Sequence, residues 1–461
     1  MIISVIGSGG KTTKIKQLKD QYLKEGKSVL MTTSTHMKIE ENTLIDPSYD
    51  EIINEIKKHG FVHAGSKAKN HKIKALDDEV LEKLKKEIDV ILIEADGSHG
   101  LPLKYPRNHE PVVDKDSSEI ILITSLKGLG KPIQDVVHGY QEMKVDGNQR
   151  VDSLFIQQLI NIYLKKISKY NVPIKIQVNG ASSLYEKALA SLLENQKEVT
   201  LINEEWFLPQ PKLVILGAGH VSQYVNKLAS MLDFYTIVID ERKEFACKEL
   251  FPEANEIHCV SFDKADSYFP KEANTCYVIV TRGHKDDRLC LKKTLFLQSL
   301  YVGMIGSKKK VRQTYDALLE EGYQQVELDK VHAPIGLPIK AITPAEIAVS
   351  IMSEIIAIKN EHQYSSITND LLEVQGDGVL CIIIDKKGST PRTVGSMMFV
   401  NEKGLVGSIG GGSEEYQAIL DAKNCQKVMM KHYELNNNES ANLGMICGGS
   451  NDVLFLPIKQ H

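Results

Sequence analysis

The sequence predicts an α/β protein with three parts: an N-terminal P-loop-like α/β domain, a central Rossmann-like doubly wound parallel sheet and a small C-terminal α+β domain. An apolar run at residues 212–216 ends in Gly217-Ala218-Gly219, a helical pattern follows, and a second apolar run ends in Asp240. This order of strand, glycine turn, helix, strand and acid is typical of a mononucleotide-binding half. A second strand-to-glycine-turn pattern opens the chain.

The central glycine turn predicts binding of a phosphate or dinucleotide. Gly217 permits the tight turn, and Gly219 lets a pyrophosphate approach the N–H groups at the following helix start. Asp240 lies about 20 residues further on, where an acid binds ribose hydroxyls. Ser222 occupies the third glycine position, so a Rossmann half used only as a scaffold stays the alternative. Because Arg242 follows the acid, the sequence does not separate NAD from NADP.

Length, charge and cysteine usage limit the function classes. At about 100–200 residues per domain, 461 residues correspond to roughly three domains. The net charge of −4 argues against a general nucleic-acid binder, and no apolar run approaches the ~18 residues that a membrane span needs. The seven cysteines form no Cys-x-x-Cys pair, as expected for a reducing cytoplasm.

The first domain, predicted for residues 1–205, opens with a strand and Gly7-Ser-Gly-Gly-Lys-Thr-Thr13. The N–H groups of Gly7, Gly9 and Gly10 are expected to cradle phosphate, with Lys11 at the outer phosphates and Thr12 on Mg²⁺. Val5 stands where the standard loop has its first glycine, so the loop is shortened or of a deviant type.

A buried strand then ends in two acids that are candidates for Mg²⁺. Asp96 is the first choice and Glu94 the second, because an acid at a strand end beside a phosphate loop commonly holds the ion. The alternative is a plain Asp-Gly turn after the strand. The turn-rich stretch at 100–111 is expected to form a loop over this site.

The motifs of this domain resemble those of the YqeC family. They are Gly-Ser-Gly-Gly-Lys-Thr-Thr, Thr-Thr-Ser-Thr-His, Glu-Ala-Asp-Gly-Ser-His-Gly-Leu-Pro-Leu-Lys and His-Glu-Pro-Val. The resemblance covers roughly the first 200 residues and implies an association with selenium-dependent molybdenum hydroxylases. A second His-Arg-Pro-type motif expected from the family is replaced by His138-Gly-Tyr140.

The central domain, predicted for residues 212–360, places more polar residues at strand ends. The strand at 276–281 leads into Arg282-Gly283-His284, with a helix expected from 289, and the strand at 301–305 leads into Gly306-Ser307. Carboxyl ends of parallel strands form one crevice, so His284 and Ser307 are expected to face the same groove as Gly217. His284 is either a proton carrier or ligand, or a hydrogen-bonded structural group.

The last domain, predicted for residues 371–461, carries three further candidates. Arg392, in Gly-Ser-Thr-Pro-Arg, is suited to pair with a phosphate, and Gly410, Gly411 and Gly412 precede a helix as a second anion site. Cys447 is flanked by a glycine loop, which suits a thiolate ligand or sulfur carrier. The alternative is an inert, partly buried cysteine.

The central and last domains resemble XdhC/CoxI proteins, which are maturation factors for molybdenum hydroxylases. The matching motifs are Gly-Ala-Gly-His-Val, Asp-Glu-Arg, Arg-Gly-His-Lys-Asp-Asp, Gly-Met-Ile-Gly-Ser-Lys-Lys-Lys, Ala-Pro-Ile-Gly-Leu-Pro, Gly-Ser-Thr-Pro-Arg, the triple glycine and Met-Ile-Cys-Gly-Gly. The resemblance makes Cys447 the leading reactive residue. In the family the small domain usually precedes the Rossmann domain, and some members carry a cysteine where this chain has Ser413.

Together these resemblances imply a cytoplasmic accessory protein that matures a molybdenum hydroxylase, with a selenium-dependent enzyme favoured. The last two domains are expected to bind the pterin molybdenum cofactor, with Cys447 near the metal or carrying sulfur or selenium, and the first domain a nucleotide with Mg²⁺. Expected partners are the apo-hydroxylase, a sulfur or selenium donor protein and further copies of the chain, without nucleic acid or membrane. The alternatives are an NAD(P)-dependent oxidoreductase using His284 as acid and base, and a P-loop NTPase or kinase.

Overall fold

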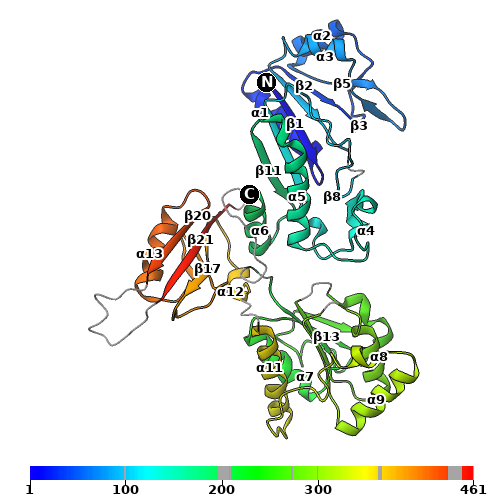
Figure 1. Cartoon of the computed structure of the whole chain (residues 1–461), viewed down its shortest axis with the longest axis vertical. Coiled ribbons are helices and arrows are strands. Elements are labelled where there is room, and N and C mark those ends of the chain that lie inside the picture. The colour runs from blue at the N-terminus through cyan, green and yellow to red at the C-terminus, as the bar shows by residue number, and fades with distance from the viewer. Residues whose placement is uncertain are drawn as a thin grey trace. The chain divides into compact units, whose positions relative to one another are not determined.

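The computed structural model describes residues 1–97, 100–195, 207, 209–270, 274–297, 299–361, 366–434 and 449–459. It divides into two compact units, Met1–Ile202 and Asn203–His461. The second unit contains two separate sheets, one parallel and one antiparallel (Figure 1).

A nine-stranded, mostly parallel sheet forms the centre of the N-terminal unit, in the order β11-β9-β1-β7-β2-β5-β6-β3 with β4 beside β5. Strands β11, β9, β1, β7, β2 and β5 are parallel, whereas β6 and β3 are antiparallel additions at the edge. Runs of Ile, Val and Leu explain the central strands, because a parallel sheet is buried on both faces. The strands are β1 (Ile2–Gly7), β2 (Val29–Thr33), β3 (His36–Lys38), β4 (Leu44–Ile45), β5 (Phe61–Lys67), β6 (Lys72–Lys74), β7 (Val90–Glu94), β9 (Glu119–Ser125) and β11 (Ile174–Asn179).

Helices cover this sheet, and their first residues show why they begin where they do. Ser48 and Ser183 each form a capping box with a glutamate three residues later, and the Asp152 side chain accepts the Phe155 N–H. A short pair of strands, β8 (Leu103–Lys104) and β10 (Val137–His138), lies outside the main sheet. The helices are α1 (Lys11–Lys24), α2 (Tyr49–His59), α3 (Asp78–Leu84), α4 (Ile133–Val136), α5 (Ser153–Ile167) and α6 (Leu184–Glu194).

His63 on β5 is a buried histidine that links the stability of this unit to pH. Burial and the nearby charge of Lys16 lower the pKa of His63 to about 4, against the opposing effect of Glu40. Between pH 6.5 and pH 4 the unfolded chain therefore binds a proton that the folded unit does not. We expect the free energy of unfolding to fall by roughly 3 kcal/mol as the pH drops through this window. Denaturant titrations at several pH values measure this slope; a His63→Gln variant with the same slope would contradict the assignment.

The parallel sheet of the second unit has the order β14-β13-β12-β15-β16, in which the strand order reverses beside β12. All of its neighbours are parallel. This is the doubly wound arrangement expected from the sequence, with its ligand crevice at the carboxyl ends of the strands. The strands are β12 (Lys212–Leu216), β13 (Tyr235–Asp240), β14 (Glu256–Cys259), β15 (Thr275–Ile279) and β16 (Tyr301–Met304).

The two faces of this sheet have separate apolar cores. One core joins the sheet to α7 (His220–Met231) and α11 (Pro344–Asn360), which pack side by side, and the other joins it to α8 (His284–Thr294) and α9 (Lys308–Glu320) (Figure 1). Helix α11 begins as the sequence indicates: Thr343 caps it, Pro344 is its first residue and Glu346 completes a capping box. A short helix, α10 (Gln325–Leu328), follows α9.

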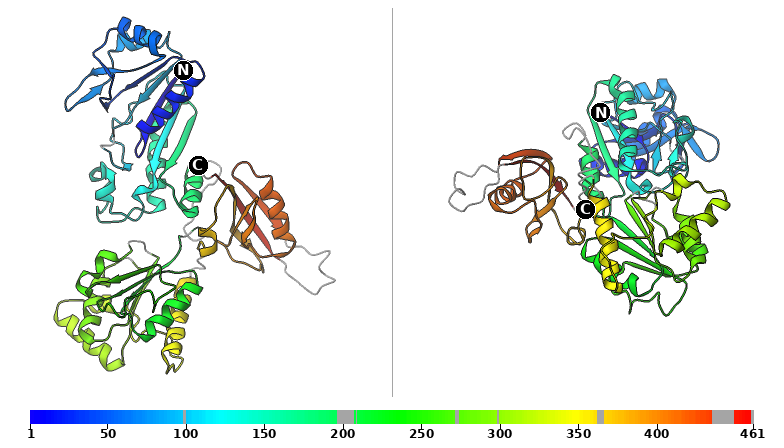
Figure 2. Two further views of the ribbon diagram at one scale, coloured as in Figure 1. Left: turned by 180° about the vertical axis from the view of Figure 1, so that it is seen from behind. Right: turned by 60° about the horizontal axis from the view of Figure 1, so that its bottom comes forward.

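The small sheet is antiparallel in the order β19-β18-β17-β21-β20, and α13 packs on one face (Figure 2). A hairpin joins two strands between residues 397 and 407, with Asn401 paired to Gly404 at the turn. The elements are α12 (Asn369–Leu372), β17 (Gly378–Lys387), β18 (Met397–Asn401), β19 (Gly404–Gly407), α13 (Gly412–Lys423), β20 (Met429–Glu434) and β21 (Ser450–Ile458).

Two predicted helix starts are wrong. Helix α8 begins at His284 rather than at 289: Gly283 adopts an extended N-cap conformation, and the first turn is helical although it carries only polar side chains. Helix α13 begins at Gly412, so the last residue of the triple glycine is helical by hydrogen bonding rather than part of the preceding loop. The strand predicted at 199–202 lies outside the described residues. Within the described ranges no helix is long and apolar enough to span a bilayer.

Candidate phosphate and cofactor sites

The glycine loop between β1 and α1 (residues 7–10) fits only glycine at three positions. Gly7, Gly9 and Gly10 have φ angles of 87°, 80° and 139°. A Cβ atom on them would lie 2.0 Å from the Ile123 carbonyl oxygen, 2.5 Å from the Ser125 Cβ and 2.4 Å from the Asn179 Nδ2, respectively. The loop therefore lies tightly against the carboxyl ends of β9 and β11, at the start of α1.

Lys11 is the first residue of α1 and is buried. Its ammonium group donates to the Gly7 carbonyl at 2.7 Å and lies 4.0 Å from Glu94 Oε1. Burial lowers the pKa of Lys11, while the carboxylates of Glu94 and Asp96 oppose that shift. A cation folded back over the loop is placed where a bound phosphate would be neutralised.

Thr12 and Glu94 come together at the end of β7. The Thr12 hydroxyl donates to Glu94 Oε2 at 3.1 Å. Burial raises the pKa of Glu94, against the opposing charge of Lys11. A hydroxyl and a carboxylate beside a phosphate loop are the donor types that Mg²⁺ takes together with phosphate oxygens.

Asp96, the first choice for a metal ligand, has both oxygens engaged within the protein. Oδ2 accepts from the Gly7 N–H at 3.2 Å and from the Tyr163 hydroxyl at 2.5 Å, and Oδ1 accepts from the Lys104 ammonium group. Burial and the neighbouring Asp96 charge raise the pKa of Tyr163 well above its usual value, so its hydroxyl stays a donor. Asp96 thus fixes the glycine loop. The Glu94 side chain is 9% exposed, against 0% for Asp96, so Glu94 is the more accessible of the two carboxylates.

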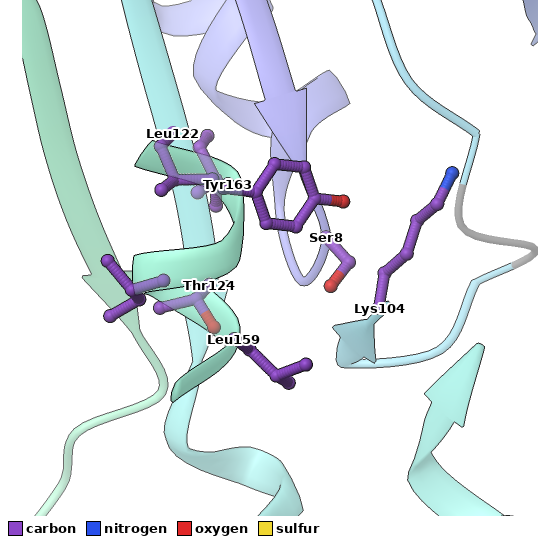
Figure 3. A pocket seen from close by; sticks show the side chains of 8 residues that line it. Ser8, Lys104, Leu122, Thr124, Leu159 and Tyr163 are labelled. Atoms are coloured by element: carbon purple, nitrogen blue, oxygen red, sulfur yellow. The ribbon is translucent and has the colours of Figure 1, made fainter. Parts of the chain in front are cut away.

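Lys104 is a site residue that the sequence analysis missed. Its side chain is fully buried and binds Asp96, the Gly97 carbonyl oxygen and, at 2.8 Å, Glu110 Oε2. Burial acts to raise the pKa of Glu110, but hydrogen bonds from Lys104 and the Arg107 N–H outweigh it and lower that pKa. Figure 3 shows the Tyr163 hydroxyl and the Lys104 side chain on either side of Ser8, around a small cavity. The role of Lys104 becomes evident only from the packing of residues 100–110, because no sequence spacing predicts its pairing with Asp96 and Glu110.

In the central crevice, Gly217 makes the tight turn that the sequence predicts. Its φ is 108°, and a Cβ atom there would lie 2.5 Å from the Val280 carbonyl oxygen. Ser222, at the third glycine position, is buried and donates to the Gly217 carbonyl at 2.6 Å. Gly219 caps α7, and a Cβ on it would meet nothing within 4 Å, so the backbone is open to a ligand there.

The tight turn gives a stability prediction with a matched control. We expect Gly217→Ala to lower the free energy of unfolding of the second unit by about 2–4 kcal/mol, because strain and a backbone clash add. Gly322→Ala is the control: its φ is 96° and its added Cβ meets nothing within 4 Å, so only the strain of about 1 kcal/mol applies. Denaturant unfolding compares them, and equal losses would contradict the close contact at Val280.

Asp240 is held by the protein itself. Oδ2 accepts from the Ala218 N–H at 2.7 Å, and the Arg242 guanidinium binds both carboxylate oxygens at 2.9 and 2.7 Å. Burial acts to raise the pKa of Asp240, but these hydrogen bonds lower it. A ribose diol at this position would therefore have to share or displace an intramolecular ion pair.

The remaining central candidates lie at helix starts. His284 is exposed in the first turn of α8, and Ser307 caps α9 by accepting the Lys310 N–H at 3.2 Å. Lys310 pairs with the buried Asp287, whose Oδ1 accepts from Thr281 at 2.6 Å. Together α7, α8 and α9 begin at the carboxyl ends of adjacent strands β12, β15 and β16, so their N–H groups face one edge of the sheet.

Three motifs of the small domain meet at one end of its sheet. A Cβ on Gly449 would lie 2.6 Å from the Ser389 carbonyl oxygen, and one on Gly410 would lie 3.4 Å from Pro391 and 3.8 Å from the Arg392 side chain. Gly410, Gly411 and Gly412 have φ angles of 141°, 75° and 75°, and added Cβ atoms on the last two would meet nothing within 4 Å. Cys447 lies outside the described residues.

Glu415 binds the inner side of this glycine turn. Its Oε2 accepts from the Ser408 hydroxyl at 2.6 Å, the Ile409 N–H at 2.9 Å and the Gly411 N–H at 3.2 Å. Burial acts to raise the pKa of Glu415, but these donors outweigh it and lower that pKa. The Glu415 carboxylate occupies N–H donors of the turn itself. A bound anion would therefore accept hydrogen bonds from the first N–H groups of α13 instead.

No cluster of three or more His, Cys, Asp or Glu side chains suited to a metal occurs among the residues that the structure describes. The candidate donors for Mg²⁺ are thus one carboxylate, one hydroxyl and the phosphates of a ligand. That donor set fits a magnesium–nucleotide complex better than a metal held by protein alone.

Comparison with family models divides the chain into three matched regions. Residues 3–141 match the YqeC protein family, residues 213–355 the XdhC Rossmann domain, and residues 371–432 the XdhC and CoxI family. Similar proteins in Escherichia coli are YqeB, 34% identical over 33% of this chain and 28% of its own, and YqeC, 34% identical over 31% and 58%.

A Bacillus subtilis protein, named as a probable subunit of xanthine dehydrogenase, is 30% identical over 32% of this chain and 43% of its own. A solved structure described as a xanthine dehydrogenase from Bacillus halodurans is 31% identical over 32% of this chain and 43% of that chain, with a TM-score of 0.30. The matches thus span less than two thirds of each of these relatives. The motif-based resemblance is confirmed: this chain joins a YqeC-like region to the Rossmann and small regions of XdhC/CoxI proteins.

Proposed function

We propose that this protein is an accessory factor that matures a molybdenum hydroxylase, binding the pterin molybdenum cofactor through its second unit and a magnesium–nucleotide complex through its first. The three matched regions and the relative named for a xanthine dehydrogenase support the accessory role. The observation that carries cofactor binding is the meeting of the Gly388–Arg392 loop, the glycine turn and Gly449 at one end of the small sheet.

In the small domain, the chain's own groups suit a phosphorylated cofactor. The first N–H groups of α13 and the exposed Arg392 would take the phosphate, and Cys447, from the adjoining segment, is the proposed ligand of the metal or carrier of sulfur or selenium. The cofactor supplies the metal and its redox chemistry when bound; these residues bind and orient it. The apo-hydroxylase and a sulfur or selenium donor protein are the proposed partners.

In the central domain, Gly217, Gly219 and the starts of α8 and α9 provide a second anion-binding edge. We assign it to the nucleotide part of the same cofactor, with Ser307 acting through its cap of α9 and His284 as the exposed polar group at the rim. The pairing of Asp240 with Arg242 makes an NAD(P)-dependent oxidoreductase the less supported alternative.

In the first unit, the parts present suit a P-loop-type site. Gly7, Gly9 and Gly10 would cradle phosphate, Lys11 would neutralise it, and Thr12 with Glu94 would complete the coordination of Mg²⁺. Asp96 supports the loop through the Gly7 N–H rather than binding the ion directly. We propose that this unit binds the nucleotide, with slow turnover at most, because phosphoryl transfer depends mainly on positioning and charge neutralisation.

The test is equilibrium binding of purified molybdenum cofactor to the full chain and to Arg392→Ala. We expect the variant to bind roughly 10- to 100-fold more weakly, because a charge-assisted hydrogen bond to phosphate is lost. Lys403→Ala, in the exposed hairpin turn, is the matched charge control and should bind as wild type. Equal binding by wild type and Arg392→Ala would contradict the placement of the phosphate, and Cys447→Ala tests the metal end separately.

A further inference from the structure

Two neighbouring glutamates at the start of α13 have opposite surroundings. Glu415 accepts three hydrogen bonds from the glycine turn and is stabilised as an anion. Glu414 is 5% exposed, and its one hydrogen bond among the described residues comes from Asn451 Nδ2 to Oε1 at 2.7 Å. Burial, and then the charge of Glu415, raise the pKa of Glu414. Carboxyl groups held in such contrasting surroundings at one site usually serve different roles.

Asn451 is itself incompletely paired. It is fully buried at the start of β21, and its Oδ1 has no hydrogen-bond partner within the described part of the chain. A buried carbonyl oxygen without a donor destabilises the fold, so such groups normally meet water or a ligand. The Asn451 amide is fixed by Glu414, which leaves Oδ1 and Glu414 Oε2 as acceptors in this pair.

The glycine turn that directly precedes this pair is open on its outer side. Gly411 and Gly412 directly precede the first turn that carries Glu414, and added Cβ atoms on them would meet nothing within 4 Å. Gly449, two residues before Asn451, packs against the Ser389 carbonyl oxygen. The pair thus lies where the three motifs of the small domain meet.

We propose that Glu414 and Asn451 form a recognition site for the amino-pyrimidinone edge of a pterin. This edge carries a ring N–H next to an exocyclic amino group, and these two donors match the two acceptors that the pair offers. An adenine edge places an acceptor there and would be rejected, because a buried acceptor would then face another acceptor. The proposal rests on the proposed function, since it names the part of the cofactor that this domain reads.

The decisive experiment compares binding of purified molybdenum cofactor to the full chain, Glu414→Gln and Asn451→Ala. Glu414→Gln keeps the size of the side chain but turns one acceptor into a donor, and Asn451→Ala removes the other acceptor. We expect each to bind roughly 10- to 100-fold more weakly, with neopterin, a simple pterin, competing on wild type and adenosine monophosphate not competing. Glu402→Gln, at the exposed hairpin turn, is the matched control and should bind as wild type.

The outcomes separate the proposed binding of the cofactor from the proposed recognition of its pterin edge by Glu414 and Asn451. Wild-type binding that both variants retain, or competition by adenosine monophosphate equal to that by neopterin, overturns the recognition site and leaves cofactor binding standing. Failure of wild type to bind the cofactor overturns both. Circular dichroism of each variant checks the fold; if Asn451→Ala unfolds, the isosteric Glu414→Gln alone decides the result.

Discussion

Replacing Lys104 by methionine is expected to lower the free energy of unfolding of the N-terminal unit by about 3–5 kcal/mol, because it leaves buried carboxylates without their cation. Lys104 is fully buried between Asp96 and Glu110, and those two side chains are 0% and 11% exposed. Stability changes of this size approach the whole stability of many domains, so the unit is expected to unfold at a much lower denaturant concentration.

A matched pair of variants separates this effect from general damage. Lys85→Met removes a lysine that binds Glu82, Asp114 and Asp116 near the surface, and partly exposed ion pairs contribute roughly 0–1 kcal/mol each. Lys104→Met combined with Asp96→Asn should recover part of the loss, since one buried charge is neutralised. Equal destabilisation by Lys104→Met and Lys85→Met would show that the buried network is not a main support of the glycine loop.

Replacing Lys11 by alanine is expected to weaken nucleotide binding by roughly 100-fold. The ammonium group donates to the Gly7 carbonyl and is buried beside the loop, so it is already placed to neutralise phosphate. Loss of a charged hydrogen bond of about 1.5–3 kcal/mol corresponds to a factor of about 10 to 150. Calorimetric titration with magnesium and a nucleoside triphosphate measures this directly.

Lys24→Ala, at the last turn of the same helix, is the control for charge and should bind as wild type. Glu94→Gln should reduce the magnesium dependence of binding more than Asp96→Asn does, because Asp96 already binds Lys104 and Tyr163. Nucleotide affinity that is unchanged in Lys11→Ala, or a larger magnesium effect in Asp96→Asn than in Glu94→Gln, would contradict this arrangement.

The sequence was sufficient to predict most of the fold where local rules act. Apolar runs indicate the parallel strands, and capping residues such as Ser183 and Thr343 account for helix starts. The start of α8 was misplaced because the polar residues from His284 onward look like a loop, although they form the first turn of a helix in which Asp287 is buried. The edge strands β3, β4 and β6 are short and partly polar, and their pairing depends on the tertiary fold.

The positions of the glycine turns were predictable from the sequence, but the side-chain contacts around them were not. Glycine turns at 7–10, 217–219 and 410–412 lie at helix starts, as expected. Glu415 binds the N–H groups of the glycine turn at 410–412, and Arg242 binds Asp240. Both contacts depend on side-chain directions, which the spacing of residues in the sequence does not determine. Lys104 lies within a resemblance motif, yet only the fold of residues 100–110 reveals that it is buried between two acids.

The most direct test of the accessory role is activation of an apo-hydroxylase of the xanthine dehydrogenase type. The full chain, loaded with purified molybdenum cofactor and supplied with a sulfur or selenium donor, is mixed with the apo-enzyme, and hydroxylase activity is followed. The account predicts activity that depends on the loaded chain and exceeds that given by free cofactor at the same concentration. No gain over free cofactor, together with tight NAD(P) binding and hydride transfer by the chain alone, would contradict it.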